Sequence, residues 1–143
     1  MLDVTRTFVV TKPLDEVVSY LRDFANTEQW DPGTVSTTRV GDGPIEVGAR
    51  WRNVSEFRGR KTELEYRLTR DEARRLTFVG KNKTVTATDD LHLREVDGGT
   101  EISYQAHFDF HGLARLAEPF LKGALGTLGD KTEAQLRETI NNR

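Results

Sequence analysis

Six consecutive stretches with the pattern of extended chain, followed by one long helical pattern, constrain the fold of this sequence most. The clearest stretch is 101–110, where large apolar and polar side chains alternate. Such alternation is typical of a strand with one buried face and one solvated face. Residues 34–40, 48–57, 61–70, 74–81 and 83–94 also have strand-like patterns. The sequence therefore predicts an antiparallel sheet with one apolar face.

The remaining segments add one strand and the helices. Residues 2–11 are rich in β-branched and aromatic types, which favour a strand. Pro13 is well placed to begin a helix that reaches Phe24, and a short helical turn is expected from Asn26 to Trp30. Residues 112–142 carry an apolar stripe at helical spacing. Strands grouped in sequence with helices at the ends favour a single α+β domain over residues 1–143.

The last helical pattern contains Gly123, Gly126 and Gly129. Each glycine costs about 1 kcal/mol in a helix relative to alanine, so their spacing requires a reason. They could bend the helix, leave room for a ligand, or form a hinge. A plain break between two helices is the alternative.

Four segments in order carry a resemblance to a known superfamily. They are FVVTKPLDEVV at 8–18, FANTEQWDPGTV at 24–35, VGARW at 47–51, and the terminal helix. Together they resemble the START-like, helix-grip (SRPBCC) superfamily, in its polyketide cyclase/dehydrase-like branch. The resemblance implies a curved seven-stranded antiparallel sheet around a long C-terminal helix, with two short helices between strands 1 and 2. It also implies a cavity for lipids, polyketides, isoprenoids or aromatic molecules. Catalytic residues vary between branches, so none is carried over.

The expected cavity wall consists of the strand side chains that face inward and of residues on the last helix. Its small residues Ala87 and Ala106 lie in mid-strand, where a filled core would favour bulk. A drug-sized ligand would need at least roughly 300 Å³. The residues expected to line the cavity are Trp51, Asn53, Ser55, Phe57, Leu64, Tyr66, Phe78, Val85, Ala87, Asp89, Tyr104, Ala106, Phe108, Phe120, Ala124 and Leu128.

Asp89 is the candidate catalytic residue, because it is the carboxylate on the apolar phase of its strand. A carboxylate that faces an apolar cavity has a raised pKa, which suits a general acid or base near neutrality. Alternatively, the strand bulges there and Asp89 lies with Asp90 in a solvated kink. His92, His107 and His111 lie on the polar phase or outside the strands, so we expect no metal site and no cofactor.

The composition excludes several other classes. The chain has 21 basic and 23 acidic residues, which lacks the basic excess of a nucleic-acid binder. It has no cysteine and no long apolar run, so we expect no disulfide and no stable membrane insertion. The start of the sequence does not have a signal-peptide pattern, and we expect a cytoplasmic protein.

Three functions remain as hypotheses. The first is binding of a small hydrophobic molecule in the cavity. The second is a cyclase or dehydratase acting on a polyketide-like substrate, with Asp89 moving protons. The third is a protein-interaction module, which would require a large exposed apolar patch. The sequence does not indicate an oligomeric state.

Overall fold

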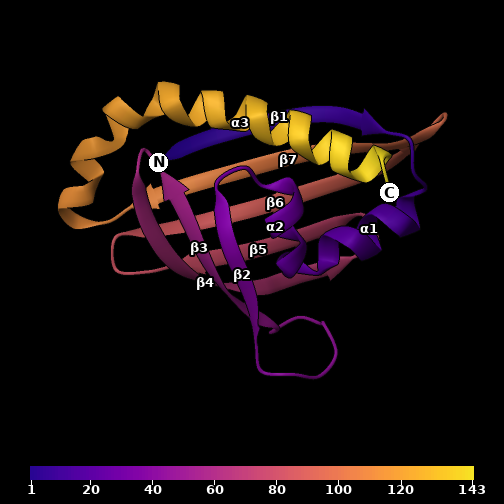
Figure 1. The fold of residues 1–143 in the computed structure, drawn as a ribbon, viewed down its shortest axis with the longest axis horizontal. Helices are drawn as coiled ribbons and strands as arrows, with labels where there is room; N and C mark the ends of the chain where they lie inside the picture. The colour runs from indigo at the N-terminus through magenta and orange to yellow at the C-terminus, as the bar shows by residue number, and fades with distance from the viewer.

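A computed structural model describes residues 1–143, with seven strands, three α-helices and two 3-10 helices (Figure 1). The elements in chain order are β1 (Leu2–Val10), α1 (Leu14–Arg22), η1 (Phe24–Asn26), α2 (Thr27–Trp30), β2 (Thr34–Val40), β3 (Arg50–Phe57), β4 (Arg60–Glu72), β5 (Arg75–Lys81), β6 (Val85–Val96), β7 (Gly99–Phe110), η2 (Gly112–Ala117) and α3 (Glu118–Asn141).

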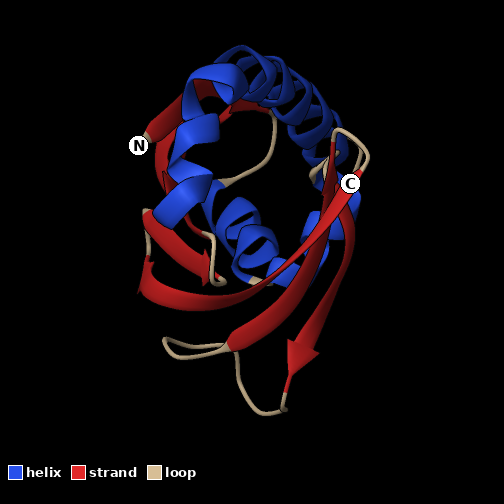
Figure 2. Ribbon diagram, turned by 90° about the vertical axis from the view of Figure 1, so that its left-hand side faces the viewer, coloured by secondary structure: helices blue, strands red, loops and turns tan.

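All seven strands form one antiparallel sheet in the order β1-β7-β6-β5-β4-β3-β2. Only the first strand leaves the sequential order, because β1 pairs with β7 rather than with β2. The sheet curves around the helices, and α3 lies along β1 on its concave side (Figures 1 and 2). This arrangement confirms the predicted helix-grip fold, including the two short helical segments between β1 and β2.

The core lies between the concave face of the sheet and the helices. The sheet contributes the inward phase of each strand, for example Leu68, Leu76 and Ile102, none of which is exposed. From α3, Leu136 and Ile140 pack against this face, and from α1 Val17 and Leu21 do the same. Burial of these apolar faces is the main force that closes the sheet around the helices.

The prediction of one helix from 112 to 142 is wrong at its start. Residues 112–117 form the separate 3-10 helix η2, and α3 begins at Glu118 with Pro119 in its first turn. Proline suits that position because its missing N–H would have no partner there. The alternative of a break at the glycines is also wrong, because α3 continues through them without interruption.

Gly129 has a packing reason that the other two glycines lack. A β-carbon at Gly129 would lie 2.5 Å from Val4 Cγ1, whereas one at Gly123 or Gly126 would meet nothing within 4 Å. The absence of a side chain at Gly129 therefore lets α3 approach β1 closely. Arg6 of β1 reinforces this contact, donating hydrogen bonds from Nη2 to the Gly126 carbonyl and from Nε to Asp130.

Candidate functional site

A cavity of about 200 Å³ lies between the concave face of the sheet and α3. Its wall includes much of the set expected from the sequence, drawn from β3, β4, β6, β7 and α3. These residues are Ser55, Phe57, Leu64, Tyr66, Val85, Ala87, Asp89, Tyr104, Ala106, Phe108 and Leu128. The small side chains of Ala87 and Ala106, which are neighbours across the sheet to Gly80 and Val4, help to leave this space open.

Three of the residues expected on the wall belong instead to a filled part of the core. The ring of Phe24, from η1, lies 6.0 Å from Trp51 and 4.6 Å from Phe78, measured between centroids. Phe24 therefore occupies the space in front of both side chains. Asn53 also lies away from the cavity, and its side-chain amide donates hydrogen bonds to Thr34 and Thr37.

The two remaining exceptions lie on α3. The residues of α3 that line the cavity are Leu121, Leu125, Leu128, Gly129 and Thr132, which recur at helical spacing on one face. Ala124 and Phe120 lie outside this face. Phe120 is 77% exposed, and Leu113 and Leu116 of η2 are 85% and 72% exposed. The sequence pattern could not show this, because the 3-10 segment changes the phase of the apolar stripe.

Asp31 is the main wall residue that the sequence patterns do not indicate. Asp31, Pro32 and Gly33 end α2 and lead into β2. The Asp31 carboxylate accepts hydrogen bonds from the Gly33 amide (3.0 Å) and the Thr34 hydroxyl (3.1 Å). This local turn holds a carboxylate at the cavity wall. The other residues missed are Val4, Gly33, Glu56, Thr62, Phe110, Leu121, Leu125, Gly129 and Thr132.

Asp89 points into the cavity from the middle of β6. The pairing of β6 with β5 and β7 continues through it without a shift, so the bulge considered above is absent. Its side chain is almost completely buried, and the Tyr104 hydroxyl lies 3.5 Å from Oδ1, at the limit of a hydrogen bond. Burial, reinforced by the negative charge of Asp31, raises the pKa of Asp89 to about 7.

Tyr66 and Tyr104 bring two hydroxyl groups to the same wall. Burial, followed by the charges of Asp89 and Asp31, raises the pKa of both phenols well above the ordinary value. Both hydroxyls therefore keep their protons at neutral pH and can donate hydrogen bonds. The ring of Tyr66 packs over Gly80, where a β-carbon would lie 2.6 Å from the ring atoms.

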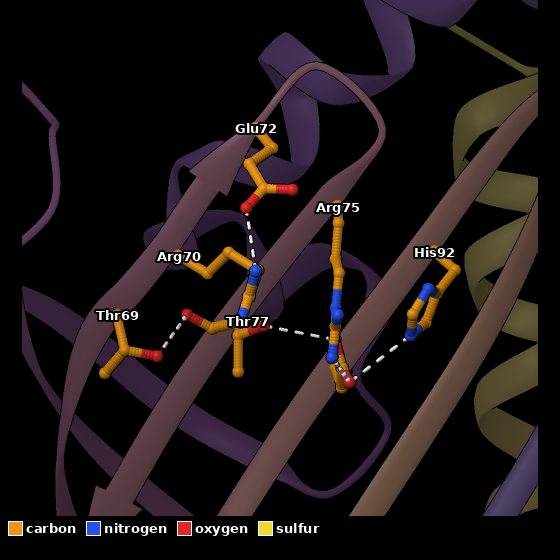
Figure 3. A network of polar contacts seen from close by, with 7 residues as sticks. Thr69, Arg70, Glu72, Arg75, Thr77 and His92 are labelled. Atoms are coloured by element: carbon orange, nitrogen blue, oxygen red, sulfur yellow. Dashed lines mark hydrogen bonds and ion pairs between the residues drawn. The ribbon is translucent and has the colours of Figure 1, made fainter.

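Asp90, the next residue, shows what a paired carboxylate looks like in this sheet. It faces away from the cavity, where it accepts hydrogen bonds from Arg75 (3.0 and 2.9 Å) and from Thr77 (3.1 Å) and contacts His92 (Figure 3). Burial raises the pKa of Asp90, but these partners outweigh burial and lower it overall. Neighbouring positions of one strand thus place two carboxylates in opposite environments.

The histidines lie away from the cavity. His92 contacts Asp90, His107 contacts Asp3, and His111 contacts the Thr86 hydroxyl. No group of His, Asp and Glu side chains has an arrangement that could hold a metal ion. None of the helices is both long and apolar enough to cross a membrane.

The cavity volume bears on the size of any guest. At about 200 Å³ it is smaller than the roughly 300 Å³ that a drug-sized ligand requires. An apolar protein cavity of about 150 Å³ holds benzene. The space therefore suits a molecule of about the size of a substituted benzene ring.

A larger depression, about 670 Å³, lies between the start of α1 and the hairpin that joins β6 to β7. Only four of its twelve lining residues are hydrophobic, and its wall includes the charged residues Lys12, Asp15, Arg22 and Glu95. It contains neither the buried carboxylate nor the tyrosines. The smaller internal cavity is therefore the candidate site.

Comparison with known structures supports the fold. A protein from Thermus thermophilus superposes with a TM-score of 0.80 at 13% identity, over 96% of each chain. The Zhui aromatase/cyclase from Streptomyces sp. R1128 gives 0.75 at 15% identity, over 98% of this chain and 91% of that one. A START superfamily protein from Mycobacterium smegmatis gives 0.73 at 13% identity, over 99% and 95%.

The family comparison covers almost the whole sequence. No curated protein matches the chain significantly. The model of the family described as polyketide cyclase / dehydrase and lipid transport, in contrast, matches residues 1–140. The chain therefore belongs to this polyketide cyclase / dehydrase and lipid transport family.

Proposed function

We propose that this protein binds a small, mainly apolar molecule in the cavity between α3 and the sheet. The observation that carries the proposal is the cavity wall, where Leu64, Ala87 and Ala106 surround a few polar groups. Ligand sites commonly combine an apolar lining with a small number of polar atoms that orient the guest. The family and its structural neighbours support a ligand-binding or cyclase role of this kind.

The volume of the cavity limits the ligand to compact molecules. A single aromatic ring with a short substituent, or a short isoprenoid unit, matches about 200 Å³. A long acyl chain or a fused polycyclic polyketide would require the wall to move. Leu121, Leu125 and Leu128 of α3 form the side of the wall that is not part of the sheet.

Filling the cavity tests the proposal. Ala106→Leu places a larger aliphatic side chain in the cavity, whereas Ala73→Leu makes the same change on the exposed turn between β4 and β5. Binding of 2-phenylethanol, measured by NMR titration, should be at least tenfold weaker in Ala106→Leu and unchanged in Ala73→Leu. Native mass spectrometry of the wild-type protein would reveal a guest that co-purifies. Equal binding by both variants would contradict the proposal.

A second candidate function is acid–base catalysis by Asp89, as in a cyclase or dehydratase. The specific observation is a buried carboxyl with a pKa of about 7, which lies beside the Tyr104 hydroxyl in an apolar cavity. A general base is most effective when its pKa is near the working pH. In this role Asp89 would remove a proton next to a carbonyl, and the Tyr104 or Tyr66 hydroxyl would stabilise the enolate oxygen.

Exchange of the α-protons of phenylacetone into D₂O, followed by NMR, tests this second candidate. The wild-type protein should accelerate the exchange, with a rate that rises through pH 7 as Asp89 ionises. Asp89→Asn should abolish the acceleration and still bind the ketone. A rate no higher than that of buffer would remove the catalytic candidate and leave the binding proposal in place.

A further inference from the structure

The charged residues at the cavity wall are all acidic. Asp31 and Asp89 contribute carboxylates to the wall, and no lysine, arginine or histidine belongs to it. Glu56 also borders the wall, but it is exposed to solvent, whereas Asp89 is buried. The negative charge is therefore not balanced by the protein at the position where a guest would lie.

Asp89 also lacks the partners that a buried carboxylate normally has. Only the Tyr104 hydroxyl approaches it, at 3.5 Å from Oδ1, and Oδ2 has no partner. Asp90, the next residue of β6, has these partners: Arg75, Thr77 and His92 surround it on the opposite face of the sheet (Figure 3). The strand therefore supplies a full set of donors to one carboxylate and leaves the other open toward the cavity.

Two further features of the wall favour a cationic guest. Asp31 is fixed by hydrogen bonds from Gly33 and Thr34, and its charge acts on Asp89. Tyr66 is buried, since only 8% of it is exposed, and its hydroxyl forms no hydrogen bond with the protein. A tyrosine hydroxyl can accept a hydrogen bond from an N–H donor of the guest.

We infer that the guest is a small arylalkyl or aliphatic amine, whose protonated nitrogen donates hydrogen bonds to Asp89 and whose apolar body fills the space beside Leu64 and Ala106. The inference rests on the proposed binding function and specifies the chemical class of the ligand. The alternative is a neutral guest with a carbonyl group, which would accept a hydrogen bond from the protonated form of Asp89. The two guests have opposite pH dependence, because the amine requires ionised Asp89 and the carbonyl guest requires protonated Asp89. The titratable groups near Asp89 are Asp31, Tyr66 and Tyr104, and none of them is a cation.

Three probes of similar size test the inference: phenethylamine, 2-phenylethanol and phenylacetate. Their dissociation constants are measured at pH 8 by NMR titration of the wild-type protein and of Asp89→Asn. A hydrogen bond to a charged group contributes about 1.5–3 kcal/mol, so phenethylamine should bind at least tenfold more tightly than the alcohol. Phenylacetate should bind most weakly. In Asp89→Asn the amine should bind no more than about threefold more tightly than the alcohol, because the asparagine amide has no charge.

The outcomes separate the inference from the function on which it rests. Equal affinity for all three probes, or tighter binding of phenylacetate, would overturn the inference and leave the binding function standing. A preference for the amine that persists in Asp89→Asn would also overturn it. Tighter binding of an isosteric ketone at pH 5.5 than at pH 8, without amine preference, would support the neutral guest instead. Failure of every probe to bind would contradict the proposed function itself.

Discussion

Replacement of Asp89 by asparagine should stabilise the protein at alkaline pH. Asp89 has its pKa raised from the ordinary value of 3.8 to about 7 in the folded state. One pKa unit corresponds to ~1.4 kcal/mol, so the ionised carboxylate costs the folded state about 4 kcal/mol above pH 7. The folded state holds its proton more tightly than the unfolded state, so this cost grows as the pH rises from about 4 to 7. The amide of the asparagine side chain does not ionise, and the variant therefore avoids the cost.

The expected size of the effect depends on the two pH values that are compared. By linkage, the stability gained in Asp89→Asn should increase by about 2.5 kcal/mol between pH 5 and pH 8. Urea unfolding followed by the fluorescence of the buried Trp30 and Trp51 measures this difference. With a typical dependence on urea, the midpoint should shift by about 1 M more at pH 8 than at pH 5.

Asp90→Asn is the matched control, one residue away on the opposite face of the sheet. The pKa of Asp90 is lowered, so this carboxylate stabilises the fold above its unfolded pKa and loses that effect on acidification. The control variant should therefore be less stable than wild type at both pH 5 and pH 8. An Asp89→Asn variant with the same stability difference at both pH values, or with reduced stability at pH 8, would contradict a raised pKa of Asp89 in the folded state.

Two further predictions concern glycines. Gly129→Ala should destabilise the protein by about 1–3 kcal/mol, because its β-carbon would overlap Val4 Cγ1, while Gly123→Ala should be neutral or stabilising by up to about 1 kcal/mol. Thermal unfolding of the two variants tests this, and equal effects would contradict the close approach of α3 to β1. Gly80→Ala should displace the Tyr66 ring from the cavity wall and weaken binding of 2-phenylethanol at least threefold, as measured by NMR titration. An unchanged affinity would show that the position of Tyr66 does not shape the cavity.

The sheet and its inward phase could be predicted because each strand carries its own signal. In β7, the alternation of Ile102, Tyr104 and Ala106 with polar residues specifies which face is buried, without information from other parts of the chain. The same alternation predicts that Asp89 faces inward, and the unbroken ladder of β6 agrees with this. Local patterns therefore determined the strands and the direction of their side chains.

The parts of the site that depend on distant contacts could not be predicted in this way. From the sequence, Phe24 is the last apolar residue of a helix. In the structure it lies in η1, and its ring packs against Tyr66 (4.4 Å between centroids) and fills one end of the space between the sheet and the helices. Asp31 appeared only as the end of a helical turn. Its position at the cavity follows from the packing of α2 against β2 and α3, which no local pattern of the sequence encodes.

The proposed guest occupies the space between the sheet and α3. Intermolecular nuclear Overhauser effects between 2-phenylethanol and the methyl groups of the protein would locate it there or elsewhere. We expect contacts from the aromatic protons of the guest to the methyl groups of Ala87, Ala106 and Leu125, which line the cavity. Contacts confined to the exposed methyl groups of Leu113 and Leu116 would place the guest on the surface and contradict binding in the cavity.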